Sequence, residues 1–187
     1  LALRLIGRLA FPIFCFLLVE GFVHTHDVKR YVCRLLLFGL VSEVPFDWAF
    51  FCTPFDPDNQ NVYWTLALGV LAMAGLKRFE TATGAPTAKG VLCMAACAVL
   101  AELAHTDYGA LGVLLIAALY LTRADRRQQC LFGGCMMLFE LTAPLAFLFI
   151  WHYNGQRGRC SKVLQRGFYL FYPVHLLLLA LITNVIL

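Results

Sequence analysis

Residues 16–48 read FLLVEGFVHTHDVKRYVCRLLLFGLVSEVPFDW and form two apolar segments joined by a short polar turn. Both segments carry ionisable side chains within or at the edge of their apolar runs. An ionised group near the centre of a bilayer costs on the order of 2.5–3.5 kcal/mol. If this stretch lies in a membrane, its charged residues therefore need partners. These ionisable residues are Glu20, His24, Arg34, Glu43 and Asp47.

The composition of the whole chain indicates a membrane protein. Hydrophobic residues make up 61% of the 187 residues and charged residues only 14%, whereas soluble domains are roughly 45–50% apolar. No polar stretch between the apolar runs exceeds about 15 residues, which is too short to bury a separate core. We therefore expect one integral-membrane domain over residues 1–187, folded as an all-α polytopic bundle of transmembrane helices.

The apolar runs predict about seven spans, because roughly 20 residues cross the hydrocarbon core as a helix. Lys and Arg are divided between the two sides of such a bundle, so the positive-inside rule does not fix its orientation. The chain begins with Leu1 rather than Met, and we expect a fragment or a trimmed product. The expected spans are 5–23, 29–52, 62–76, 90–105, 108–122, 130–151 and 167–187.

The eight cysteines and the scattered basic residues exclude some kinds of site. The cysteines lie mostly inside apolar runs without the spacing of metal ligands or disulfide frameworks, which favours simple packing. The HTHD turn has two histidines at metal-ligand spacing but no third ligand nearby, so we expect no metal. The basic residues do not gather on one face, which argues against nucleic-acid binding.

The buried charges of the first two spans can pair if these spans form an antiparallel hairpin. Glu20 then lies at the depth of Arg34, and Arg8 at the depth of Asp47. The spacings agree, since 12 residues separate Arg8 from Glu20 and 13 separate Arg34 from Asp47. We therefore predict two cross-helix ion pairs, which either serve the activity or only fix helix packing.

The SEVPFDW segment is a candidate pocket wall. Glu43 and Asp47 lie four residues apart on one helix face, where like charges repel, so at least one of them is protonated or bonded to a partner. Pro45 lies between them and predicts a broken helix. A broken helix at membrane depth is tolerated where its backbone lines a cavity; a simple proline kink is the alternative.

Two histidines are candidate catalytic bases. His175 follows Tyr172 and Pro173 in an otherwise uncharged run, and imidazole is the side chain that titrates near neutral pH. We expect it to point into the bundle toward the acidic SEVPFD corner; its alternative role is hydrogen-bonded packing. His24 shares a helix face with Glu20, an arrangement that can orient an imidazole, although a solvated turn residue is the alternative.

These residues belong to motifs that resemble the TraX family. The resemblance covers most of the chain and rests on IGRLAFPIFCFLLVEGFVHTHDVKRYVCRLLLFGLVSEVPFD, VYWTLALGV, TDYGALGVLLI and FYLFYPVHLLLL. The positions that match the family pattern are Arg8, Phe11, Pro12, Glu20, Gly21, His24, Arg34, Glu43, Pro45, Asp47, Asp107, Tyr108, Tyr172, Pro173 and His175.

The resemblance implies an acyltransferase. TraX is the conjugative pilin acetylase, and the family is similar to integral-membrane acyltransferases that use acyl-CoA. Such chemistry needs a base and positive groups for the CoA phosphates. We infer that His175, or a histidine of an upstream span, is the base, that His24 and Glu20 are further catalytic candidates, and that Arg30 and Arg34 are ligands of the phosphates. Family members also open with a further span that carries an Asp-His pair, so we expect this chain to lack one N-terminal span. The implied pocket residues are Glu43, Asp47, Tyr172, Asp107 and Tyr108.

The same resemblance implies a location and partners. We expect a multi-pass protein of the bacterial cytoplasmic membrane, in contact with the lipid bilayer, that acetylates pilin or another cell-envelope acceptor. The oligomeric state is open. The alternative function is that of a non-catalytic membrane assembly partner or a small-solute transporter. Transporters often contain repeated halves, and this sequence shows no internal repeat.

Overall fold

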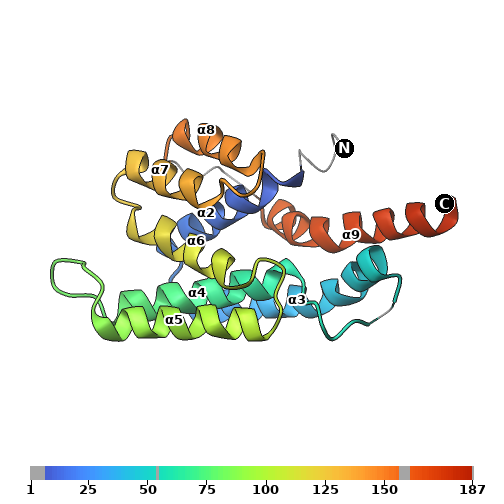
Figure 1. Ribbon diagram of the computed structural model, residues 1–187, viewed down its shortest axis with the longest axis horizontal. Coiled ribbons are helices and arrows are strands. Elements are labelled where there is room, and N and C mark those ends of the chain that lie inside the picture. The colour runs from blue at the N-terminus through green and yellow to red at the C-terminus, as the bar shows by residue number, and fades with distance from the viewer. Residues whose placement is uncertain (1–6, 54, 156–160, 187) are drawn as a thin grey trace.

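The computed structural model describes residues 7–53, 55–155 and 161–186. This part of the chain contains two isolated β-bridges but no sheet, so the all-α prediction is confirmed for it (Figure 1). The helices are α2 (Ala10–Val23), α3 (Val28–Phe51), α4 (Val62–Arg78), α5 (Ala88–Leu103), α6 (Gly109–Leu121), α7 (Arg126–Met136), the 3-10 helix η1 (Ala143–Leu145), α8 (Ala146–Trp151) and α9 (Lys162–Ile186).

Polar side chains in the turns start five of these helices. The first turn of a helix leaves backbone N–H groups without an intrahelical partner, and a short polar side chain at the N-cap accepts from one of them. Such a cap contributes about 0.5–2 kcal/mol to stability. The caps that accept a backbone N–H are Asp27 for α3, Asn61 for α4, Thr87 for α5, Asp125 for α7 and Ser161 for α9.

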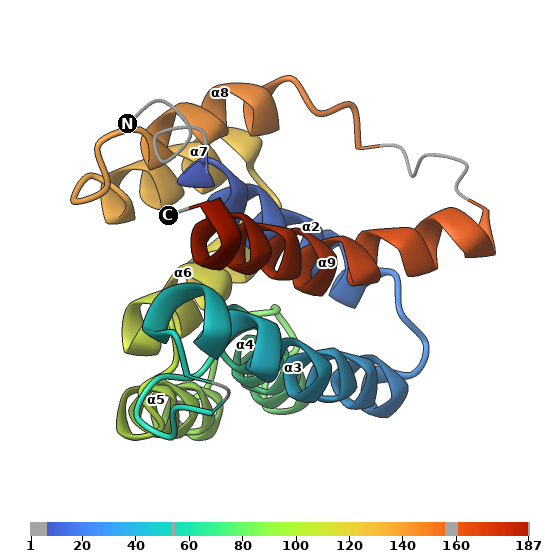
Figure 2. The same ribbon diagram turned by 90° about the vertical axis from the view of Figure 1, so that its right-hand side faces the viewer.

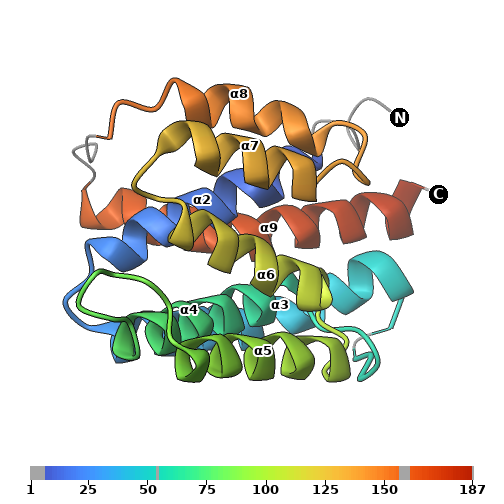
Figure 3. The same ribbon diagram turned by 60° about the vertical axis from the view of Figure 1, so that its left-hand side comes forward.

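The helices lie in three tiers, best seen in Figure 3. The first tier contains α3, α4 and α5, the second α2, α6 and α9, and the third α7 and α8. α4 is central because it packs against α2, α3, α5 and α6. α9 packs along α3, and Figure 2 shows it above α3 and crossing in front of α2.

Small residues let the neighbours of α4 approach closely. A side chain at Gly69 would overlap Ile116 of α6, and a Cβ at Gly75 would come within 2.6 Å of the Cβ of Cys93 in α5. Ile116 is fully buried at this contact. Burying a side chain of this size contributes about 1.5–3 kcal/mol, so the glycines are what allow α6 and α5 to bury their apolar faces on α4.

The prediction that this fold is a bundle of transmembrane helices is wrong. Among the described residues, no helix combines the length and the apolarity that crossing a bilayer requires. A span needs about 20 apolar residues, whereas α4, α5 and α6 have 17, 16 and 13. α3 has 24 residues, but five of them are charged; these are Lys29, Arg30, Arg34, Glu43 and Asp47.

Two further predictions about single helices are also wrong. The expected span 130–151 is divided into α7, η1 and α8, because the chain turns over residues 137–142 before Pro144 enters the 3-10 helix. Conversely, α3 continues through Pro45 to Phe51 instead of breaking there. Packing of α3 against both α4 and α9 supports the helix on either side of the proline.

Two neighbouring glycines in α7 provide a test of this packing. A Cβ at Gly133 would overlap the Phe147 ring and lie 3.0 Å from Leu119, whereas a Cβ at Gly134 meets nothing closer than 3.9 Å. We expect Gly133→Ala to lower the free energy of unfolding by about 1–3 kcal/mol through overpacking. Gly134→Ala, the matched control, should be neutral or raise it by up to about 1 kcal/mol because alanine favours helix. Urea unfolding of the two variants measures the difference, and equal midpoints would contradict the packing described.

Candidate active site

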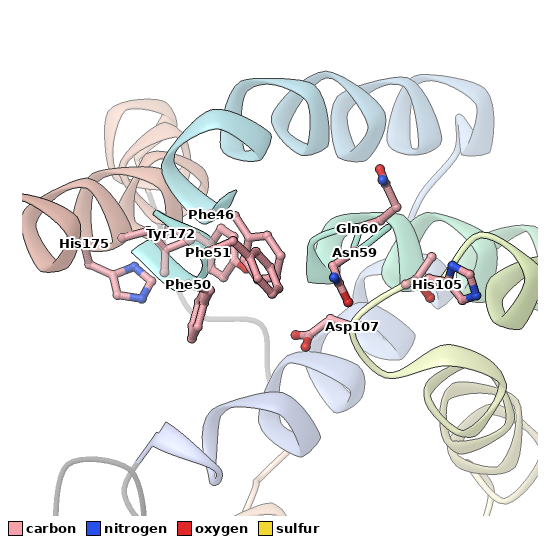
Figure 4. A pocket seen from close by; sticks show the side chains of 11 residues that line it. Phe46, Phe50, Phe51, Asn59, Gln60, His105, Asp107, Tyr172 and His175 are labelled. Atoms are coloured by element: carbon pink, nitrogen blue, oxygen red, sulfur yellow. The ribbon is translucent and has the colours of Figure 1, made fainter. Parts of the chain in front are cut away.

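An aromatic wall at the C-terminal end of α3 forms one side of a pocket of about 340 Å³. Phe46, Phe50 and Phe51 contribute its rings (Figure 4). α3 ends at Cys52, whose φ of 56° lies in the left-handed region and turns the chain away from the helix axis. The volume falls within the 300–1,000 Å³ typical of small-molecule sites.

The opposite side of the pocket consists of two loops that are tied together. The backbone N–H of Gln60 donates to the His105 carbonyl oxygen at 3.0 Å, and the N–H of Asp107 donates to the Gln60 carbonyl oxygen at 2.9 Å. Beneath them, the Thr65 hydroxyl donates to the Thr106 hydroxyl at 3.0 Å. These bonds hold the segment before α4 against the segment before α6, although the two are more than forty residues apart in sequence.

α9 places His175 and Tyr172 on the aromatic side of the pocket. His175 Nδ1 lies 3.0 Å from the Phe171 carbonyl oxygen, which can only accept a hydrogen bond. A neutral imidazole therefore carries its proton on Nδ1, and Nε2 keeps a free lone pair. The ring lies between Phe171 and Tyr172, with centroids at 5.1 and 5.4 Å, so aromatic contacts fix its orientation.

Asp107 faces His175 and the aromatic wall from the loop side, as Figure 4 shows, whereas Gln60 and His105 point away. The surrounding protein displaces water from its carboxyl group, and this desolvation, together with repulsion from Glu140, raises the pKa of Asp107 to about 6. Glu140 in turn lies 3.0 Å from Arg8 Nε. Asp107 therefore titrates close to the range in which histidine does.

A buried polar network lies behind the pocket, between α3 and α4. The Asn61 amide, fully buried, donates to the Gly39 carbonyl oxygen at 2.8 Å and to Glu43 Oε2, and its own oxygen accepts from the Tyr63 N–H at 3.0 Å. Trp64 Nε1 donates to the same Glu43 oxygen at 3.0 Å. Burial raises the pKa of Glu43 despite these donors. Glu43 thus joins the two helices and is absent from the pocket lining.

Asp47 has a related supporting position. It is fully buried, and its Oδ2 accepts from the Asp56 N–H at 2.8 Å, which fixes the loop after α3. Burial raises the pKa of Asp47 as well, and its charge is one of the causes that raise the pKa of Glu43.

Tyr108, another predicted pocket residue, stacks on Phe11 of α2 beside the pocket rather than in its lining.

The predicted ion pairs Glu20–Arg34 and Arg8–Asp47 do not form. Glu20 Oε1 lies 3.7 Å from Arg126, and Arg8 pairs with Glu140. The prediction assumed a hairpin of α2 and α3, but α2 packs mainly on α6, α8 and α4, while α3 packs on α4 and α9. Arg34 instead donates to the Arg30 carbonyl oxygen at 3.3 Å and lies over the Tyr31 ring.

The remaining predicted residues lie at the other end of the bundle. His24 is exposed at the C-terminus of α2, where its Nδ1 lies 2.8 Å from the Glu20 carbonyl oxygen. Arg30 pairs with Asp27 at 2.9 Å. Twelve residues of α3 separate Arg34 from Phe46, which corresponds to roughly 18 Å along the axis. The structure therefore brings His175, Tyr172 and Asp107 into one pocket but not His24, Glu20, Arg30 or Arg34.

Sequence reasoning missed the residues that organise this pocket. Asn61 follows the DPDNQ turn and Trp64 lies in an apolar run, and neither was singled out as a site residue. An asparagine directly before an apolar run was nevertheless a visible N-cap signal. Nothing in the sequence around Phe46, Phe50 and Phe51 indicates that they line a pocket, because this depends on where α9 packs against the end of α3.

A comparison of sequences gives the chain its family. The sequence profile described as TraX protein matches residues 2–183. The chain belongs to the TraX family. This TraX family member is also 31% identical over 198 residues to the probable fimbrial assembly protein FimC, serogroup H1, of Dichelobacter nodosus, with 95% of this chain and 81% of the relative covered. No solved structure matches the TraX family member.

The titration of Asp107 in this TraX family member can be measured directly. We expect the carboxyl carbon of Asp107 to titrate with a midpoint near 6 in an NMR experiment, because desolvation and Glu140 both favour its protonated form. Glu140→Gln removes the repulsion and should lower that midpoint. Glu80→Gln is the charge-matched control, since Glu80 is not among the groups that act on Asp107. A midpoint at the ordinary aspartate value in the unmodified chain would contradict the environment described.

The same shift has a consequence for stability. Because the folded-state pKa of Asp107 is raised, the folded chain binds a proton more tightly than the unfolded chain between about pH 4 and 6. Asp107 therefore makes the free energy of unfolding fall as pH rises through that range. Asp107→Asn should reduce this fall, which urea unfolding at pH 4 and at pH 7 can measure. An unchanged pH dependence in Asp107→Asn would show that other groups are responsible.

Proposed function

We propose that the chain is an acyltransferase that moves an acetyl or similar acyl group from acyl-CoA to an amine or hydroxyl acceptor, with His175 as its general base. The observation that supports this most strongly is the state of the His175 ring. The Phe171 carbonyl oxygen holds the proton on Nδ1, so Nε2 is free to accept a proton in a pocket with an aromatic wall on one side and polar loop residues on the other. Family membership adds to this argument.

The proposed reaction needs one base and no metal. The acceptor amine or hydroxyl attacks the thioester carbonyl carbon while Nε2 of His175 takes its proton. The new bond between the acceptor and the carbonyl carbon forms as the carbon–sulfur bond breaks. The imidazolium then gives the proton to the departing thiolate, which leaves as CoA thiol, so the base returns to its starting state.

Two other pocket residues have roles in this proposal. The Asp107 carboxylate, ionised at neutral pH, shares the pocket with His175 and stabilises the imidazolium that forms during transfer. Tyr172 stays a neutral hydroxyl because burial raises its pKa, so it serves as a hydrogen-bond donor rather than a base. Phe46, Phe50 and Phe51 provide an apolar surface on one side of the reacting groups.

The donor binds with its phosphates outside the pocket in this proposal, because the described lining contains no Lys or Arg. Arg30 already pairs with Asp27, whereas no carboxylate pairs with Arg34 in the described part of the chain. Arg34 is therefore the better of the two predicted phosphate ligands. An arginine fork suits a phosphate because two parallel hydrogen bonds can form. The acyl end and the phosphate would then be separated by roughly 18 Å along α3.

The acceptor in this proposal is a pilin or another cell-envelope protein. It is supported by the name of the relative, a probable fimbrial assembly protein, and by membership of the TraX family. Contact with the cytoplasmic membrane surface belongs to the same proposal. It is supported by large apolar side chains exposed on α5 and α9, such as Leu92 (71%), Leu103 (72%) and Phe171 (62%), since exposed apolar patches mark interaction surfaces.

A second candidate function is that of a non-catalytic assembly partner. The relative's name favours it, because assembly requires binding but no chemistry. The two candidates differ in what His175 does. In an assembly partner, replacing His175 would alter at most the local packing, whereas in an acyltransferase it would remove the reaction and leave pilin binding intact.

The test compares three histidines that share one local geometry. The Nδ1 atoms of His24, His152 and His175 each lie within 3.0 Å of a carbonyl oxygen four residues earlier, but only His175 lines the pocket. We expect His175→Gln to reduce release of CoA from acetyl-CoA in the presence of pilin by about 10²–10⁴-fold. His152→Gln and His24→Gln should leave the rate unchanged.

Mass spectrometry of the pilin in the same reactions identifies the acyl group and the modified residue. Circular dichroism and pilin co-purification check that His175→Gln is folded and still binds. CoA release that His175→Gln does not change would remove His175 from the mechanism. Absence of acyl transfer by the unmodified chain, with pilin binding retained, would favour the assembly partner.

A further inference from the structure

A groove between α7 and α8 lies apart from the pocket of His175. Its volume is about 420 Å³, and Figure 3 shows the two helices side by side in the outermost tier, running in opposite directions. Its walls are almost entirely apolar, with Cys130 and Gly134 from α7 and Pro144 and Phe147 from η1 and α8. The groove is therefore suited to an apolar guest.

One end of the groove carries a positive charge. Because α7 and α8 are antiparallel, Arg127 at the start of α7 and Trp151 at the end of α8 lie at the same end. Gly134 and Pro144 lie at the other end, and seven residues of α7, or roughly 10 Å, separate Arg127 from Gly134. The groove thus has a charged end and an apolar end.

Arg127 is available to a ligand. No carboxylate pairs with its guanidinium among the residues that the structure describes, and its side chain is exposed. The neighbouring arginines are occupied: Arg126 binds Gln129 and Glu20, and Arg123 lies 4.0 Å over the Tyr120 ring and donates to its carbonyl oxygen. Of these three arginines, Arg127 is therefore the one whose charge faces the groove.

We propose that the α7–α8 groove binds a linear medium-chain fatty carboxylate, with its head group on Arg127 and its chain directed toward Gly134 and Pro144. A guanidinium fork pairs with a carboxylate through two parallel hydrogen bonds. Trp151 suits the same end, because an indole combines an apolar ring with a hydrogen-bond donor. The apolar lining of the groove accepts the hydrocarbon chain. This inference does not rest on the proposed acyl transfer.

Gly134 makes the groove open enough for a chain. A Cβ added at this position meets only Phe147, at 3.9 Å, so the space above Gly134 is free. A Cβ at Gly133 would overlap the same ring, which shows that α8 packs on Gly133 and leaves Gly134 facing the groove. Gly134→Leu should therefore fill the groove without displacing α8, and it removes binding if the chain of the ligand lies there.

The experiment uses dodecanoate that carries a photoreactive diazirine at its terminal carbon, with the purified full chain. We expect saturable labelling that maps by mass spectrometry to the segment around Gly134 and Pro144. Unlabelled dodecanoate should compete, whereas dodecanol and dodecyltrimethylammonium should compete at least tenfold less well, because neither offers Arg127 an anion.

Three variants sharpen the result. Arg127→Gln should weaken labelling about tenfold, since a charge-assisted pair is lost, and Gly134→Leu should abolish it. Arg123→Gln removes an equal charge outside the groove and should have no effect. Circular dichroism checks that each variant is folded; if Gly134→Leu does not fold, Arg127→Gln and the competition series decide.

Several outcomes would overturn the proposal. One is labelling spread over the exposed apolar side chains of α5 and α9 in proportion to their exposure, which would indicate non-specific partition. Another is equal competition by the cationic amphiphile, which would exclude a role for Arg127. A third is labelling that folded Gly134→Leu leaves unchanged, because the chain would then lie elsewhere.

Discussion

The hydrogen bonds of the buried Asn61 side chain are the interaction on which the pocket depends. One amide group caps α4, binds the backbone of α3 at Gly39 and donates to Glu43. A buried polar group without a partner costs about 1–3 kcal/mol, so this geometry is favoured over any sliding of α3 along α4. The loop before Asn61 is thereby fixed, and through the contacts of Gln60 with His105 and Asp107 it fixes the second loop as well.

α9 completes the site from a distant part of the sequence. The Tyr63 hydroxyl donates to the Tyr169 carbonyl oxygen at 3.0 Å, and Phe38 stacks on the Tyr169 ring with centroids 4.9 Å apart. These contacts set the position of α9 along α3. His175 lies six residues further on and so reaches the aromatic end of α3. The local bond that orients its imidazole is shared by His24 and His152, which means that position, not local geometry, distinguishes His175.

Charge is divided between the two ends of the bundle. The end where α4 and α6 finish and α7 begins collects basic side chains, including Lys77, Arg78, Arg123 and Arg127. The end with the pocket collects acidic ones, including Glu43, Asp47, Asp107 and Glu140. Short polar loops connect the helices. Because successive helices pack antiparallel, every second loop lies at the same end of the bundle. The division therefore follows from topology.

The sequence by itself determined the helical class, the approximate positions of most helices and the family. Apolar runs and turn residues act over a few positions, so the helices around residues 10–23, 62–78 and 109–121 could be predicted without any tertiary contact. Four motifs spread over most of the chain likewise indicated the TraX family, which the profile match over residues 2–183 confirms. High apolar content, in contrast, suggested membrane spans, whereas no helix in the described part of the chain is long and apolar enough to cross a bilayer.

Only the tertiary structure decided which charges meet and which residues form the site. Pairing of Arg8 with Glu140 and of Glu20 with Arg126 depends on which helices are neighbours, and the spacing of residues along α2 and α3 contains no information on that. Asp107 and His175 share a pocket because the loop before α6 and the helix α9 meet at one end of α3. Such contacts join residues far apart in sequence, so they follow from packing of the whole chain and not from any local pattern.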